Sequence, residues 1–161
     1  MDKQKKLYPD LIMKIHHEIE VYNYRLDIIL AGISNGKAHI YGVFNPGISQ
    51  CFDALGFHAI GSGLPHALNT LIARNCNQDT SLSEALLAVY EAKKLAEKAP
   101  GVGTKRTDIC VITPQKRVEF SGEQIGILNE GYTKWMNRDL SWTTDIMTLL
   151  KSSEVIQNGS I

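Results

Sequence analysis

The dipeptide Asn35-Gly36 lies between two apolar runs and is the feature that most constrains the fold. Asn and Gly tolerate the positive φ angles of a type I′ turn, the turn that best joins two antiparallel strands. Residues 26–33 before it are nearly all apolar and rich in β-branched side chains, and residues 39–44 after it have the pattern of a second strand. The sequence therefore predicts a β-hairpin, with a first strand that is buried on both faces.

The segments that flank this hairpin alternate between helical and extended patterns. Before it, residues 10–24 repeat apolar side chains with the 3.6-residue period of an amphipathic helix. After it, a turn at 45–47 leads to a short third strand over 48–52. Residues 64–73 then have the pattern of a helix that follows a glycine-rich turn. The first half of the chain is therefore predicted to be a helix, three strands and a second helix.

The second half of the chain carries a further helix signal. Ser81 and Glu84 have the spacing of a capping box, in which each side chain bonds a free backbone N–H, and this helix is expected to end at Pro100. A strand over 108–113 and its partner over 118–120 follow. The predicted helical tail, residues 121–152, comprises helices over 123–135 and 141–151, and it precedes a frayed end over 157–161.

The composition is that of one globular domain. With 161 residues, 43% hydrophobic and 21% charged side chains and no repeats, we expect a single domain over 1–161 of the α+β class. Because 17 basic side chains balance 17 acidic ones, we expect no nucleic-acid partner and no anionic membrane surface as a partner. No apolar run approaches the roughly 20 residues of a membrane span. We expect a cytoplasmic protein without a cofactor.

Three residue patterns occur in an order that points to a known family. They are Leu30-Ala31-Gly32-Ile33 with Ile40-Tyr41-Gly42-Val43-Phe44-Asn45-Pro46-Gly47, then Ala59-Ile60-Gly61-Ser62-Gly63, and then Leu82-Ser83-Glu84-Ala85 with Thr107-Asp108-Ile109-Cys110-Val111-Ile112. Together they resemble the proteasome-type branch of the N-terminal-nucleophile hydrolases, which includes proteasome α and β subunits and the HslV-like bacterial peptidases. The resemblance covers residues 12–113, and its specificity comes from the order and spacing of the motifs.

The resemblance implies an αββα sandwich, in which two antiparallel sheets lie between layers of helices and the strands are covered on both faces. It also implies that Gly61, Ser62 and Gly63 form a turn near the nucleophile, with Ser62 the one side chain that matches a residue of that site. Backbone N–H groups at the start of the next helix would then be exposed to bind a small anion. The alternative is that the two glycines only make a tight turn.

The catalytic residues of the family have no counterpart in this sequence. Family members begin with a Thr, Ser or Cys whose free α-amino group is the base, on a strand pair that also carries an assisting Asp and Lys. Here, a charged segment after Met1 leads directly to a helix that resembles the family's second one. The positions that match its supporting Asp and Ser are Pro100 and Gly103. We therefore expect this chain by itself to be non-catalytic.

Three hypotheses for function follow from the resemblance. The chain is the C-terminal portion of a threonine-type peptidase or amide hydrolase, completed by an N-terminal segment or a partner subunit. Alternatively, it is a non-catalytic, self-assembling scaffold, or a small-anion-binding module that uses Gly61, Ser62 and Gly63. Removing two strands from a sandwich leaves an open sheet edge and an uncovered apolar face, which proteins usually pair or cover. We expect a homo-oligomer, or C-terminal helices that cover the gap.

Cysteine and histidine side chains are further candidates for nucleophilic chemistry. The three cysteines lie far apart without a C-x-x-C pair, so neither a disulfide framework nor a zinc site is predicted. Cys51 lies in the same part of the chain as His58 and His66, which would suit a Cys–His pair. A buried, inert thiol is the favoured interpretation of Cys51. Cys110, between two apolar residues, is predicted to lie in the core.

The remaining polar and aromatic clusters have simpler interpretations. His16 and His17 point about 100° apart on a helix and cannot face one ion, so a solvated helix face is predicted and no metal site. Lys105 and Arg106 either hold an anion or belong to a polar loop. The aromatic residues of the tail either form an interface or pack on their own domain: Tyr132, Trp135 and Trp142, with Met136 beside them.

Overall fold

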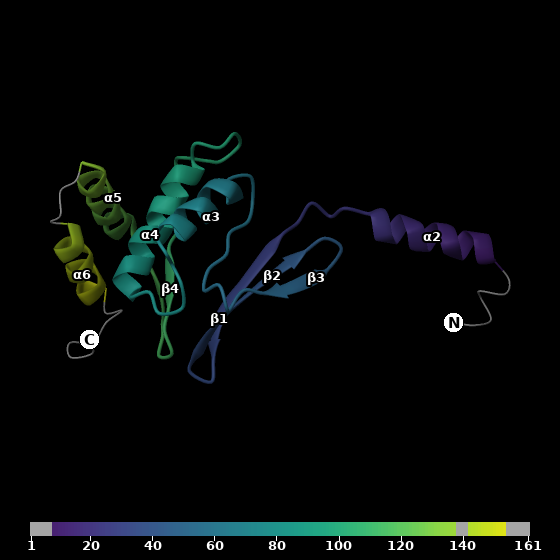
Figure 1. Ribbon diagram of the computed structural model, residues 1–161, viewed down its shortest axis with the longest axis horizontal. Coiled ribbons are helices and arrows are strands. Elements are labelled where there is room, and N and C mark those ends of the chain that lie inside the picture. Colours follow the sequence, from purple (N-terminus) through teal and green to yellow (C-terminus); the bar gives the residue numbers. More distant parts are fainter. Residues whose placement is uncertain (1–7, 138–141, 154–161) are drawn as a thin grey trace.

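The computed structural model describes residues 8–137 and 142–153. Its elements are, in order, α2 (Pro9–Val21), β1 (Ile28–Ser34), β2 (Lys37–Phe44), β3 (Ile48–Cys51), α3 (Leu64–Ala73), α4 (Leu82–Ala96), β4 (Cys110–Ile112), β5 (Arg117–Glu119), α5 (Gly122–Met136) and α6 (Trp142–Ser152). They form a mixed α+β structure with two small antiparallel sheets, β1-β2-β3 and β4-β5 (Figure 1). The α+β class is confirmed, whereas the αββα sandwich stays a prediction.

The hairpin of β1 and β2 forms at the predicted turn. The two strands pair as far as Ser34 and Lys37, so that Asn35 and Gly36 alone make the loop. Both loop residues have positive φ angles, 52° at Asn35 and 74° at Gly36, as a type I′ turn requires. The loop therefore sets the register in which every later pair of the hairpin meets.

Side chains alternate along a strand, so the three-stranded sheet has two distinct faces. We call the face that carries Ile29, Ala31 and Ile40 the inner face, because these residues face α3 and α4 across a shared groove. The outer face carries Ile28, Leu30, Tyr41 and Val43. Ile28 and Leu30 are 40% and 58% exposed, respectively. The prediction that this strand is buried on both faces is therefore wrong, because no described element covers the outer face.

The helices α3 and α4 pack against each other beside the sheet. A small apolar cluster of Phe57, Leu71, Ala88 and Ala92 is buried between them and the chain segment that follows β3. The start of α4 has the predicted capping box, in which Glu84 N–H donates to Ser81 Oγ and Ser81 N–H donates to a Glu84 carboxylate oxygen. Capping satisfies amides that have no partner within the helix, which explains where α4 begins.

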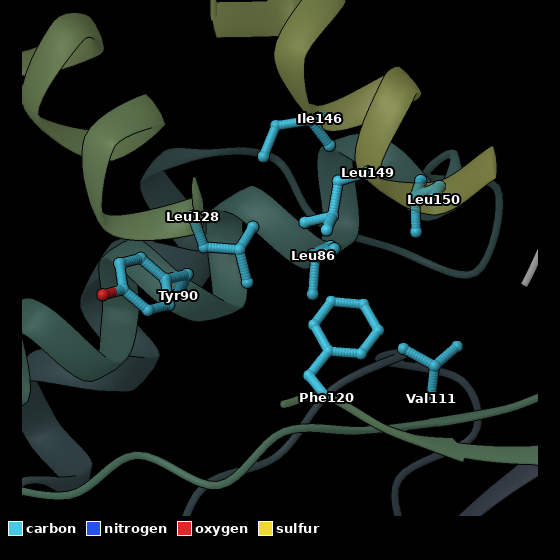
Figure 2. Close-up of a cluster of buried hydrophobic side chains, with 8 residues drawn as sticks. All are labelled: Leu86, Tyr90, Val111, Phe120, Leu128, Ile146, Leu149 and Leu150. Carbon is cyan, nitrogen blue, oxygen red and sulfur yellow. The ribbon is translucent and has the colours of Figure 1, made fainter. Parts of the chain in front are cut away.

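The main core lies in the C-terminal half of the chain. It joins α4 to the β4–β5 hairpin and to the helices α5 and α6, as Figure 2 shows. Leu128, Ile146 and Leu150 have no exposed surface within this core. The buried cluster comprises Leu86, Tyr90, Val111, Phe120, Leu128, Ile146, Leu149 and Leu150. The tail helices α5 and α6 therefore cover α4 and the β4–β5 hairpin. They leave the outer face of the three-stranded sheet uncovered.

The first described helix, α2, lies apart from the other elements (Figure 1). None of its residues is buried, although its apolar positions repeat with helical spacing. His16 and His17 are both exposed, as predicted for a solvated helix face, and His16 forms an ion pair with Glu20 one turn later. Within the described residues, no helix has both the length and the hydropathy that are needed to cross a membrane.

Candidate functional site: a groove beside an open strand

A groove separates the inner face of the sheet from the helix pair. Its volume is about 470 Å³, and Ile29, Ala31 and Ile40 form the wall on the sheet side. The opposite wall is formed by small and aliphatic side chains of the helix pair: Ala67, Leu71, Val89, Ala92 and Ala96. An opening lined by apolar groups on both sides favours an apolar occupant, because water gains few hydrogen bonds there.

Two polar side chains line the groove, and both have limited capacity to bind a charged group. His58 stacks on Phe52 at 3.7 Å between ring centroids, and its Nε2 is buried without a hydrogen-bond partner among the described residues. Burial lowers the pKa of His58, which favours the neutral imidazole. Lys93 forms an ion pair with Glu97, which also accepts from Lys94 at 2.8 Å. The groove therefore suits an apolar occupant.

One edge of the groove is an unpaired strand. In the described structure, β1 pairs with β2 on one side and has no partner strand on the other. The free edge presents backbone N–H and C=O groups that another extended segment can bind. Because the inner face of β1 also forms part of the groove wall, a strand added here would place alternate side chains into the groove.

The predicted glycine turn stands at the start of α3. Gly61 has a φ of 89°, which favours glycine, and Gly63 is buried as the residue that precedes the helix. A Cβ atom at Gly63 would lie 2.7 Å from that of Ala96, so this glycine is needed where α3 approaches α4. Of the first amides of α3, that of Leu64 already donates to Gly61 O, and Pro65 has none. The helix start therefore offers few donors for an anion, and Ser62 is exposed beside it.

Cys51 does not lie in the core, contrary to the favoured prediction. It is exposed at the end of β3, because its position in the pleat places it on the outer face, opposite Tyr41. The structure brings it near Asp53, whose Oδ2 lies 2.7 Å from His39 Nδ1. Asp53 also accepts from Ile40 N–H at 2.8 Å, and this bond, followed by His39, lowers the pKa of the carboxyl group.

This outer-face cluster is not arranged as a nucleophile triad. The imidazole would have to bond both the thiol and the carboxylate, yet His39 bonds Asp53 and forms no hydrogen bond with Cys51 among the described residues. The charges of Cys51 and Asp53 raise the pKa of Tyr41, so the phenol stays protonated. The bonds from Asp53 to His39 and Ile40 extend the β2–β3 pairing beyond the last strand residue. We interpret the cluster as a clasp for the sheet.

The other predicted candidates lie in separate places. His66 is on α3, away from Cys51, and His58 is held by its aromatic neighbours, so neither forms the alternative Cys–His pair. Cys110 is exposed, contrary to prediction, because it alternates with the buried Val111 in an edge position of β4. Lys105 and Arg106 are exposed in a loop, which agrees with the polar-loop interpretation. No group of three or more potential ligands among the described residues is placed to hold a metal ion.

Tyr132 and Trp135 of the tail pack on their own domain, whereas Met136 is 53% exposed. Tyr132 packs against the main core, and the ring of Trp135 lies 4.1 Å from the guanidinium carbon of Arg74. The side chain of Trp142 lies outside the described residues, as do Met1 and residues 157–161. Arg74 also binds Glu91 at 2.6 Å across α3 and α4. This pair has no signal in the sequence, because a separation of 17 positions does not correspond to a helical spacing.

Comparison with known proteins gives no relative for this chain. No family model, no curated protein and no solved structure matches it significantly.

Proposed function

We propose that this chain is part of a proteasome-like N-terminal-nucleophile hydrolase domain and, by itself, is a non-catalytic assembly module. Extended strands that bind in the groove and along the free edge of β1 would complete it. The proposal is supported by the order of the sequence motifs and by the hairpin, helix pair and β4–β5 hairpin that follow in the same order. In the family that the sequence resembles, a second antiparallel sheet lies between the first sheet and the helices.

The observation that carries the proposal is the pairing of an apolar groove with an unpaired strand. Ile29 and Ala31 alternate with outward-facing residues on β1, so they line the groove while the backbone of the same strand remains free to bond. A small-molecule ligand would use the groove but not the backbone edge. An added strand uses both, because main-chain bonds hold it and its alternate side chains fill the groove.

The non-catalytic part of the proposal rests on the candidate side chains. Ser62 is exposed in the glycine turn, and no basic side chain among the described residues forms a hydrogen bond with its hydroxyl. Cys51 is on the opposite face of the sheet from the groove, next to a carboxylate that does not activate a thiol as a histidine would. We expect the isolated chain to leave fluorogenic peptide amides intact, and a turnover that is lost in Ser62→Ala would contradict this.

The strand-binding part can be tested with a displayed library of β-hairpin peptides. We expect selected binders to alternate apolar and polar residues, and to protect the backbone amides of β1 from hydrogen exchange. Ala31→Lys, which places a charge in the groove wall, should abolish this binding. Ser34→Lys is the matched control on the same strand and should leave binding unchanged. Binders that leave the β1 amides unprotected, or that tolerate Ala31→Lys, would overturn the proposal.

A further inference from the structure

The helix α2 carries an apolar stripe that nothing in the described structure covers. Leu11, Ile15, Ile19 and Tyr22 recur at three- and four-residue spacing and therefore share one side of the helix. Each is 46% to 62% exposed. Burying side chains of this size is a large favourable contribution to folding or association. A helix with such a stripe, and with no buried residue, gains most of its stability only when another surface covers it.

The connection between α2 and β1 holds this helix away from its own sheet. Asn45, in the turn after β2, accepts from Tyr24 N–H at 2.8 Å and donates through Nδ2 to Tyr22 O at 3.1 Å. Asn23 accepts from Arg25 N–H at 2.7 Å, and Arg25 has a φ of 51°. These bonds fix the connection against the β2–β3 turn, and Figure 1 shows α2 extending from there away from the rest of the chain.

The outer face of the sheet is the second uncovered surface of the same chain. The pairs Ile28–Val43 and Leu30–Tyr41 place four apolar side chains next to one another on this face. Tyr41 is 42% exposed, and Leu30 is more exposed still. β1 has 7 residues and α2 has 13, which correspond to about 23 Å and about 20 Å. The helix and the sheet patch therefore match in length.

We propose that two copies of this chain form a two-fold dimer, in which α2 of each copy packs across the outer face of the other. A two-fold dimer uses the same pair of surfaces twice, so both helices and both sheets are covered at once. The charges agree with this pairing, since Glu18 borders the stripe and Lys37 lies on the outer face. Neither forms an ion pair with another described residue. The contact is independent of the groove, which is on the opposite face.

Crosslinking between two differently substituted chains tests the proposal directly. In a background of Cys51→Ser, Cys76→Ser and Cys110→Ser, one preparation carries Ile15→Cys and a ¹⁵N-labelled one carries Leu30→Cys. The two are mixed, treated with a short bis-maleimide and analysed by peptide mass spectrometry. We expect a peptide pair that joins a labelled chain to an unlabelled one. A further preparation carries both Ile15→Cys and Leu30→Cys on one chain. Crosslinks only within single chains of this double variant would overturn the proposal in favour of a helix that folds back on its own sheet. The absence of a crosslink in both experiments would also overturn it.

Sedimentation of point variants gives a second readout. Ile15→Asp places a carboxylate in the stripe and should raise the dimer dissociation constant at least about tenfold, since the burial of one aliphatic side chain is lost twice. His17→Asp changes the opposite side of the same helix and should leave the constant unchanged. Both positions are exposed, so both variants should fold. Equal effects of the two variants, or a parent chain that is monomeric at high concentration, would contradict the proposal. Ala31→Lys changes the groove wall and should not affect this dimer. A failure of the dimer proposal can therefore be told apart from a failure of the strand-binding proposal.

Discussion

Replacing Gly63 with Ala tests how closely α3 approaches α4. The added Cβ would lie 2.7 Å from the Cβ of Ala96 and 3.2 Å from both Ala96 O and Val102 Cγ2. Two carbons cannot remain at 2.7 Å, so one helix must shift, and overpacking of this kind costs about 1–3 kcal/mol. The φ of Gly63 is −84°, which any L-residue adopts, so none of the loss comes from the backbone.

Two further substitutions separate this clash from other effects. Ala96→Gly removes the nearest atom and should restore part of the loss, although it costs about 0.5–1 kcal/mol of its own in a helix. Gly61→Ala is the matched control, because the φ of Gly61 is 89° and a Cβ there meets nothing within 4 Å. It should cost about 1–2 kcal/mol through backbone strain alone. We therefore expect a coupling energy between Gly63→Ala and Ala96→Gly, and no coupling energy between Gly61→Ala and Ala96→Gly.

The assay is equilibrium unfolding in urea, followed by tryptophan fluorescence, for all single and double variants. The coupling energy between Gly63→Ala and Ala96→Gly should be at least about 1 kcal/mol, well above the roughly 0.5 kcal/mol scatter of independent sites. An unchanged urea midpoint for Gly63→Ala, or a coupling within that scatter, would refute the close approach. In that case close packing against α4 would not explain why position 63 is a glycine.

Two more predictions follow from burial. Burial lowers the pKa of His58 in the folded chain. Below the ordinary histidine pKa of about 6.5, the unfolded chain therefore binds a proton more readily than the folded chain does. The free energy of unfolding should fall from pH 7 towards pH 5. His58→Phe should lose this part of the pH dependence in urea titrations, and identical profiles would contradict it. Cys51 and Cys110 are exposed, whereas burial raises the pKa of Cys76. Iodoacetamide at pH 8 should therefore label Cys51 and Cys110 faster than Cys76, which peptide mass spectrometry measures. Equal labelling rates would contradict the burial of Cys76.

Local signals in the sequence predicted local structure well. Asn35-Gly36 predicted both the turn and its two-residue length, because the backbone angles are a property of those residues themselves. The capping box at Ser81 marked the start of α4 for the same reason. An equivalent signal at Ser121 and Gln124, which the structure shows as a second capping box, was present in the sequence and was missed.

Burial could not be predicted in the same way, because it depends on which elements come to lie on a strand. Leu30 belongs to an apolar run and is nevertheless exposed, since α2 does not cover it. Cys110 lies between two apolar residues in the sequence, yet it faces outward in the pleat, as Cys51 does. The pair of Arg74 and Glu91 needs α3 and α4 to be placed first. The groove itself is a tertiary feature and had no local signal.

The position of the main core late in the chain has a consequence for biosynthesis. Leu149 and Leu150 of α6 are needed to close it, whereas the hairpin of β1 and β2 is synthesised roughly 100 residues earlier. At about 5–20 residues per second, the ribosome takes some 5–20 s to make that stretch. Until α6 is made, Leu86, Phe120 and Leu128 lack the side chains that close the core around them. The nascent chain is therefore most exposed to misassembly before α6 emerges, and a chaperone that shields exposed apolar side chains would act at this stage.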